Sequence, residues 1–113
     1  MFDLLLDFVT QRRTHFESNL RGVNGYTGRG DITFAVWPNG KRKLDVALRG
    51  VAGRVAEIYA NDALAATIDL NDGRAGRTFD TRRGDPVPHL TRDARLDVRQ
   101  NGQIILEGAF NTE

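Results

Sequence analysis

The feature that most constrains this sequence is a pair of Asn-Gly dipeptides, each set between stretches in which apolar and polar residues alternate. The first is Asn39-Gly40 and the second is Asn101-Gly102. Both residue types tolerate positive φ angles, and between alternating stretches they are the strongest local signal for a β-hairpin. The chain is therefore expected to contain at least two hairpins of an antiparallel sheet.

The loop length of the first hairpin follows from which register places apolar residues opposite each other. A two-residue loop would place Phe34 opposite Asp45, whereas a three-residue loop from Pro38 to Gly40 places Phe34 opposite Leu44. Opposite residues share one face of a sheet, so the three-residue loop keeps that face apolar. Proline also suits the second position of a type I turn, and glycine suits the left-handed position after it. We therefore predict the three-residue loop.

The same test favours a three-residue loop, residues 100–102, in the second hairpin. That loop places Leu96 opposite Leu106, whereas a two-residue loop would place Leu96 opposite Glu107. The two hairpins are thus expected to share one turn type.

Further strands are expected around these hairpins. An irregular strand is predicted near residues 16–21, two strands at residues 54–60 and 63–70 joined by the turn Asn61-Asp62, and a short strand at residues 77–81. Seven or eight strands at spacings of roughly 8–12 residues indicate a small antiparallel sandwich or barrel. The expected core residues are Ile32, Phe34, Leu44, Val46, Leu48, Val55, Ile68, Leu70, Phe79, Leu96, Val98, Ile104, Leu106 and Phe110.

The N-terminal segment carries an apolar stripe that a β domain does not need. Phe2, Leu5, Leu6 and Val9 recur near helical spacing, which favours a short helix within residues 1–13. Apolar residues also alternate in this segment, so a first strand is the competing interpretation. An exposed stripe of this kind is rarely tolerated by an isolated soluble monomer, so we expect it to pack against protein.

Length and composition indicate one domain that is stabilised by neither disulfide bonds nor a bound metal. We expect residues 1–113 to form a single domain in which residues 14–113 are a β meander. The chain has no cysteine and no recognisable export signal, which favours a cytoplasmic protein. It has 16 basic and 15 acidic residues and a net charge of +1, so we expect neither nucleic acid nor membrane insertion.

Residues that could support catalysis or metal binding are scattered. His15 and His89 have no second ligand at metal-binding spacing, so no metal or cofactor is expected. Asp45, Asp69 and Asp97 fall at positions expected to face solvent, where charge is ordinary. A hydrolase that uses these aspartates is therefore the least favoured hypothesis, and we expect no enzyme.

Two Arg-Gly-Asp tripeptides, at residues 29–31 and 83–85, match the motif that integrins read. Gly-Asp pairs are ordinary turn chemistry in a chain this rich in Arg, Gly and Asp, so we do not expect integrin binding.

The favoured hypothesis is a non-enzymatic protein–protein interaction module or structural subunit of a homo-oligomer or larger assembly. Its partner-binding residues would be those of the N-terminal stripe, Phe2, Leu5, Leu6 and Val9. The alternative is a β-sandwich that binds carbohydrate or another small polar molecule. Its aromatic and basic platform would consist of Tyr26, Trp37, Arg42 and Tyr59.

Overall fold

The computed structural model of the protein describes residues 13–110, which form eight antiparallel strands and one turn of 3₁₀ helix. The strands are β1 (Thr14–Gly22), β2 (Arg29–Val36), β3 (Arg42–Arg49), β4 (Val55–Ala60), β5 (Ala63–Asp69), β6 (Arg74–Asp80), β7 (Arg95–Gln100) and β8 (Gln103–Ala109), with η1 (Thr81–Arg83) after β6. They form one sheet in the order β5-β4-β7-β8-β1-β2-β3-β6. The expected fold class, an antiparallel sandwich or barrel of seven or eight strands, is confirmed.

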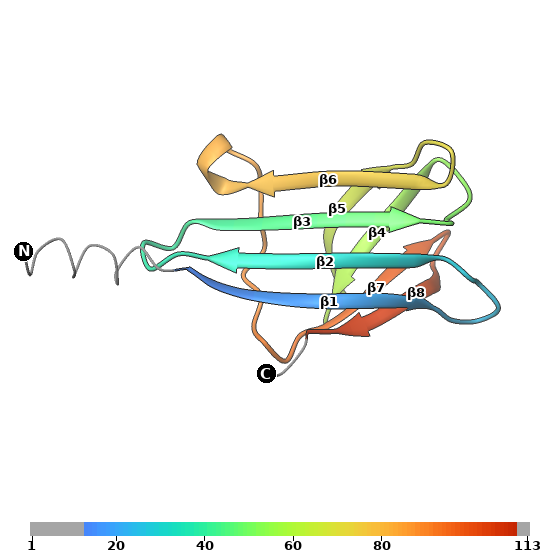
Figure 1. Ribbon diagram of the computed structural model, residues 1–113, viewed down its shortest axis with the longest axis horizontal. Coiled ribbons are helices and arrows are strands. Elements are labelled where there is room, and N and C mark those ends of the chain that lie inside the picture. The colour runs from blue at the N-terminus through green and yellow to red at the C-terminus, as the bar shows by residue number, and fades with distance from the viewer. Residues whose placement is uncertain (1–12, 111–113) are drawn as a thin grey trace, which may run out of the picture.

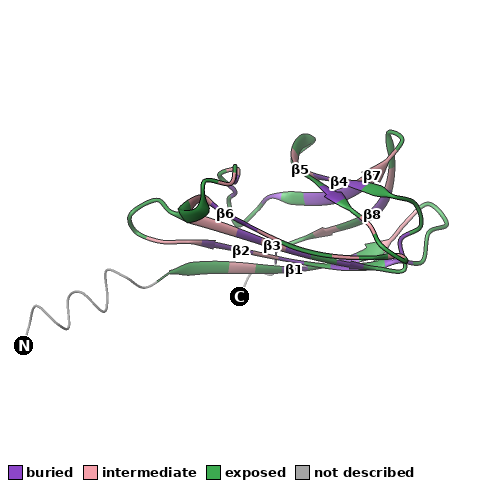
Figure 2. Ribbon diagram, turned by 90° about the horizontal axis from the view of Figure 1, so that it is seen from above, coloured by how far each residue is buried: buried purple, intermediate pink, exposed green. Residues whose placement is uncertain are grey.

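The sheet bends where β8 meets β1, and this bend makes it barrel-like. β1 and β8 pair at only two positions, Arg21 with Glu107 and Gly22 with Leu106. One half of the sheet therefore consists of β1, β2, β3 and β6, which lie side by side in Figure 1. The other half consists of β8, β7, β4 and β5. The view turned by 90° shows the two halves facing each other as layers (Figure 2).

The strand order departs from the simple meander expected for residues 14–113. After β3 the chain crosses to the other half and forms the β4–β5 hairpin there. It then returns, so that β6 pairs with β3, and residues 84–94 cross once more to reach β7. The sheet consequently has two ends, β5 and β6, that come from neighbouring segments of the sequence.

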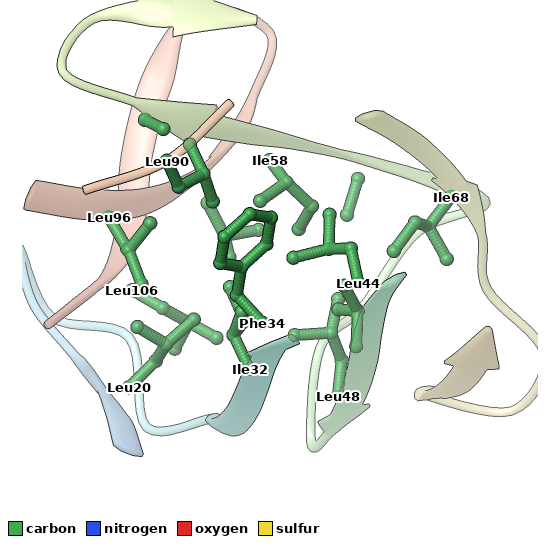
Figure 3. Close-up of a cluster of buried hydrophobic side chains, with 14 of the residues drawn as sticks. Leu20, Ile32, Phe34, Leu44, Leu48, Ile58, Ile68, Leu90, Leu96 and Leu106 are labelled. Atoms are coloured by element: carbon green, nitrogen blue, oxygen red, sulfur yellow. The ribbon is translucent and has the colours of Figure 1, made fainter. Parts of the chain in front are cut away.

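The hydrophobic core lies between the inner faces of the two halves (Figure 3). Most of the predicted core residues are buried there, but Val55 is 44% exposed and Leu70 and Ile104 are only partly buried. On β4 the inward positions are Ala56, Ile58 and Ala60, so Val55 has the opposite phase and faces outward.

The predicted register of the first hairpin is confirmed. Phe34 lies opposite Leu44, and Ile32 lies opposite Val46. The N–H of Gly40 donates to the carbonyl of Trp37 at 2.9 Å, and Gly40 has a φ of +88°. Pairing of apolar residues was therefore sufficient to determine this loop.

The prediction of a three-residue loop in the second hairpin is wrong. The loop consists of Asn101 and Gly102 alone, with φ angles of +53° and +78°, as a type I′ turn requires. A bulge then inserts Ile105 as an extra residue in β8, so Val98 lies opposite Leu106, and Leu96 lies opposite Gly108 instead of the predicted Leu106. The bulge reconciles the preferred turn with the apolar register, and it buries Ile105 in place of the predicted Ile104.

The predicted N-terminal helix lies outside the described residues, and so do Phe2, Leu5, Leu6 and Val9. Only the last residue of that segment, Arg13, is described, and it is exposed. Between residues 13 and 110 the chain forms no helix that is long and apolar enough to cross a membrane.

Candidate functional site

The strongest candidate interaction site is the open seam between the two ends of the sheet. Among the described strands, β5 pairs only with β4, and β6 pairs only with β3. A strand that is paired on one side presents unpaired backbone N–H and C=O groups on the other. Such an edge is a template to which a second polypeptide can add a strand.

The β6 edge is protected by charge. Arg74 and Arg77 are exposed along the strand, and the guanidinium of Arg83 reaches back and donates to the carbonyl of Thr78 at 2.6 Å. Charged side chains on an edge oppose the approach of another strand. This side of the seam is therefore a poor template for strand addition.

The β5 edge has no such protection. No charged residue occurs between Ala63 and Ile68, and the side chains at positions 63, 65 and 66 are those of alanine. Leu64 is 53% exposed, which makes it the most exposed large apolar side chain among the described residues. An uncharged edge with an exposed leucine is a surface that natural β proteins normally cover, and here only a bulge at Ala65 interrupts the strand. We therefore treat the β5 edge as the candidate site.

A hollow of about 400 Å³ adjoins the β5 edge. Leu64 and Ala65 form its β5 wall, and the remaining lining residues are Arg42, Thr81, Asp85, Pro86, Val87 and Pro88. The two prolines hold this part of the connection extended. The hollow gives the edge a preformed border into which an apolar side chain of a partner can pack.

Arg42 holds that border in place. Its Nε and Nη2 atoms donate to the carbonyl of Val87 at 3.1 Å and 3.0 Å, and Val87 itself is buried. A bidentate interaction of this kind fixes the position of a loop carbonyl. Arg42, predicted as part of a ligand platform, is therefore occupied in joining β3 to the proline-containing connection.

The carboxylates near the seam are ionised and paired. The Arg82 guanidinium, followed by the Arg82 backbone N–H, lowers the pKa of Asp80 from 3.8 to about 2. The pKa of Asp85 is also lowered, chiefly by the backbone N–H of Asp80 and then by Arg83. Neither carboxylate holds a proton near neutral pH, so these groups serve as hydrogen-bond acceptors in a structural network.

The structure does not bring together the predicted platform of Tyr26, Trp37, Arg42 and Tyr59. Tyr26 lies in the β1–β2 loop, at the opposite end of β2 from Trp37. Tyr59 lies on β4 in the other half of the sheet. Trp37 stacks with Arg82 at 4.4 Å and Tyr59 with Arg99 at 4.0 Å, so each ring has a partner within the fold.

The two histidines and Ser18, the one serine that could act as a nucleophile, also lie apart. His15 is exposed and lies near Glu17, whereas Ser18 is buried in the core on the opposite face of β1. The Ser18 hydroxyl finds no hydrogen-bond partner among the described residues. His89 is exposed in the connection between η1 and β7.

The three aspartates considered for a hydrolase lie on three different strands. Asp45 is on β3, Asp69 on β5 and Asp97 on β7, and no two of these strands are neighbours. Residues 13–110 contain no group of three His, Cys, Asp or Glu side chains that could hold a metal ion.

The expectation that Asp97 faces solvent is wrong. It is only 9% exposed, because the guanidinium of Arg99 covers its carboxylate, with Nε donating at 2.7 Å. Arg99 also donates to Asp62 at 2.8 Å, and these bonds raise its pKa, with Asp97 as the largest cause. An ion-pair network therefore buries a side chain at an outward position of the strand. The alternation of apolar and polar residues in the sequence does not reveal this burial.

The two Arg-Gly-Asp tripeptides differ in setting. Residues 29–31 lie within β2, with Gly30 buried. In the second, Gly84 follows η1 with a φ of +87°, while Arg83 and Asp85 pair with each other at 3.1 Å.

One sequence signal pointed to the candidate site, but strand order was needed to interpret it. The alanine-rich stretch at residues 63–68, which carries no charge, is visible in the sequence. That this stretch forms an edge follows only from the topology. In comparisons with known proteins, no family model matches the chain, and no curated protein matches it either.

Proposed function

We propose that the protein is a non-enzymatic interaction module that assembles with a second copy of itself by antiparallel pairing of the two β5 strands. The observation that carries this proposal is the β5 edge, uncharged from residue 63 to residue 68, with an exposed Leu64 beside the hollow. The opposite edge, β6, carries charged side chains that discourage the same contact.

A second copy is a suitable occupant because a two-fold axis makes the paired strands antiparallel. The two copies of Asp69, the one charged residue of β5, then lie at opposite ends of the strand pair. Alanine side chains allow close approach, and the partner strand covers Leu64. Pairing of unpaired backbone groups supplies the directional part of the contact.

A single strand pair gives a small interface compared with the roughly 1,200–2,000 Å² of stable complexes. The apolar stripe of the N-terminal segment, Phe2, Leu5, Leu6 and Val9, is therefore proposed to add to it. Those residues lie outside the described part of the chain, so their contribution is tested separately below.

The proposal is tested by the variant Leu64→Lys, with mass measured by sedimentation equilibrium. Leu64 is 53% exposed, so lysine at this position should leave the fold intact while placing a charge on the edge. We expect a dimer for the wild type and a monomer for the variant, with far-UV circular dichroism showing that the variant is folded.

Val55→Lys is the matched control, because Val55 is also exposed, at 44%, but lies on β4, which is paired on both sides. It should leave the dimer intact. A monomeric wild type at tens of micromolar, or equal dissociation of both variants, would refute assembly through β5.

A further inference from the structure

Four arginines form a continuous row on the outer face of one half of the sheet. Arg21 of β1 lies opposite Arg29 of β2, Arg29 lies opposite Arg49 of β3, and Arg49 lies opposite Arg74 of β6. All four are exposed. Neighbouring strands are roughly 4.8 Å apart, so this arginine row spans about 14 Å across the sheet.

The arginine row is not neutralised by the fold around it. Arg49 has one carboxylate nearby, Asp31 at 3.9 Å, and both groups are largely exposed, which makes the pair weak. Arg29 donates to the carbonyl of Gly28 at 3.2 Å. The side chains of Arg21 and Arg74 form no hydrogen bond or ion pair with the described residues. Like charges directly opposite each other destabilise a sheet, so an anion bound across the row would relieve this repulsion.

The row continues into a hollow of about 760 Å³ where β1 separates from β8. Arg21 and Arg29 line this hollow together with Arg95, whose guanidinium lies 3.8 Å from Asp62. Asp62 and Asp97, which also line it, are already bound by Arg99. Glu107, opposite Arg21 on β8, is the remaining carboxylate at this end of the row.

We propose that the arginine row binds the phosphate backbone of a single-stranded nucleic acid. Guanidinium groups match phosphate oxygens with paired donors, and a line of four can meet successive phosphates of an extended strand. Tyr26, in the loop between β1 and β2, is 41% exposed and anchored by its hydroxyl to Gln103, so its ring can stack on an unpaired base. Exposed aromatic rings beside basic rows suit single strands, because duplex bases are already stacked.

The net charge of +1 led us to expect no nucleic-acid binding, but a net charge sums over the whole chain and does not show where the charges lie. The arginines of the row come from positions 21 to 74 and are gathered only by the strand register. The row and the β5 edge are separate surfaces. Leu64→Lys should therefore leave nucleic-acid binding unchanged, and the two proposals can fail independently.

The test measures binding of a fluorescein-labelled oligothymidylate by anisotropy at increasing salt concentrations. The double variant Arg49→Gln/Arg74→Gln removes two charges from the row, and Arg13→Gln/Arg54→Gln removes two exposed arginines outside it. We expect binding to weaken about tenfold or more in the row variant and to change less than about twofold in the control. The slope of log K against log salt should become shallower by about 1.4 in the row variant, which corresponds to two lost phosphate contacts.

Circular dichroism confirms that each variant is folded before binding is compared. Failure of the wild type to bind the oligonucleotide at low salt would overturn the proposal, as would equal losses in the two double variants. Polyglutamate and unlabelled oligothymidylate are then compared as competitors at equal concentrations of negative charge. If polyglutamate displaces the labelled oligonucleotide more effectively, the proposal is overturned, and an acidic protein partner is indicated instead.

Discussion

At the residue scale, the turns of this fold depend on backbone conformations that few residue types adopt. Gly40 and Gly102 have φ angles of +88° and +78° in the two hairpins singled out by the sequence. Asn101 supports the second turn with a φ of +53°. Asparagine accepts this region because its short side chain can bond locally, whereas a β-branched residue is strained there.

Gly40→Val and Gly102→Val are therefore expected to lower the free energy of unfolding by about 1–3 kcal/mol each. A Cβ atom at either position would meet nothing within 4 Å, so the loss would come from backbone strain rather than from a steric clash. Urea denaturation monitored by tryptophan fluorescence measures this loss in the free energy of unfolding. Gly76→Val is the control, because Gly76 has equally open surroundings but no positive φ in β6. Losses as large in the control would mean that the turn assignments do not explain the effect.

At the element scale, the preference for apolar residues to lie opposite each other predicted the loop of the first hairpin correctly and that of the second wrongly, for a physical reason. In the first, the turn residues and the apolar register agree, so Phe34 opposite Leu44 could be derived from the sequence. In the second they conflict, and the chain resolves the conflict with the bulge at Ile105. A bulge is set by packing on both faces of the strand, which a single sequence does not display.

The short helix η1 gives a prediction of pH dependence. Asp80 caps it by accepting from the Arg82 N–H at 2.9 Å, and Arg82 holds the pKa of Asp80 at about 2 rather than 3.8. Because folding lowers this pKa, the contribution to stability is full above about pH 3.8 and is lost as the pH falls toward 2.

We expect Asp80→Asn to lower stability at pH 6 and to flatten its decline between pH 4 and pH 2, as measured by urea denaturation across that range. Asp72→Asn, in the exposed β5–β6 turn, is the control and should leave both unchanged. An Asp80 variant with the same pH profile as the wild type would show that the cap does not contribute to acid unfolding.

At the scale of the whole molecule, both candidate surfaces arise from topology. β5 is an edge only because the chain crosses between halves after β3, and the arginine row gains its fourth member, Arg74, only because β6 returns to pair with β3. The sequence displayed the ingredients, an uncharged stretch and an excess of arginine. Their positions depend on long-range pairing, which local patterns do not determine.

Deletion of residues 1–12 tests the role of the N-terminal segment in the whole molecule. Residues 13–110 already enclose a continuous core between the two halves, so the β domain should stay folded by far-UV circular dichroism. Burial of Phe2, Leu5, Leu6 and Val9 against a partner would contribute about 1.5–3 kcal/mol each before the costs of ordering and association. We therefore expect the deletion to weaken self-association measured by sedimentation.

A matched full-length variant with serine at positions 2, 5, 6 and 9 separates loss of apolar contact from loss of chain length, and should behave like the deletion. If the deletion instead unfolds residues 13–110, the segment belongs to the core of the same chain. If it leaves the fold and the mass unchanged, assembly rests on the β5 edge alone. In that case Leu64→Lys should be sufficient to produce a monomer, because no second contact would remain to hold the copies together.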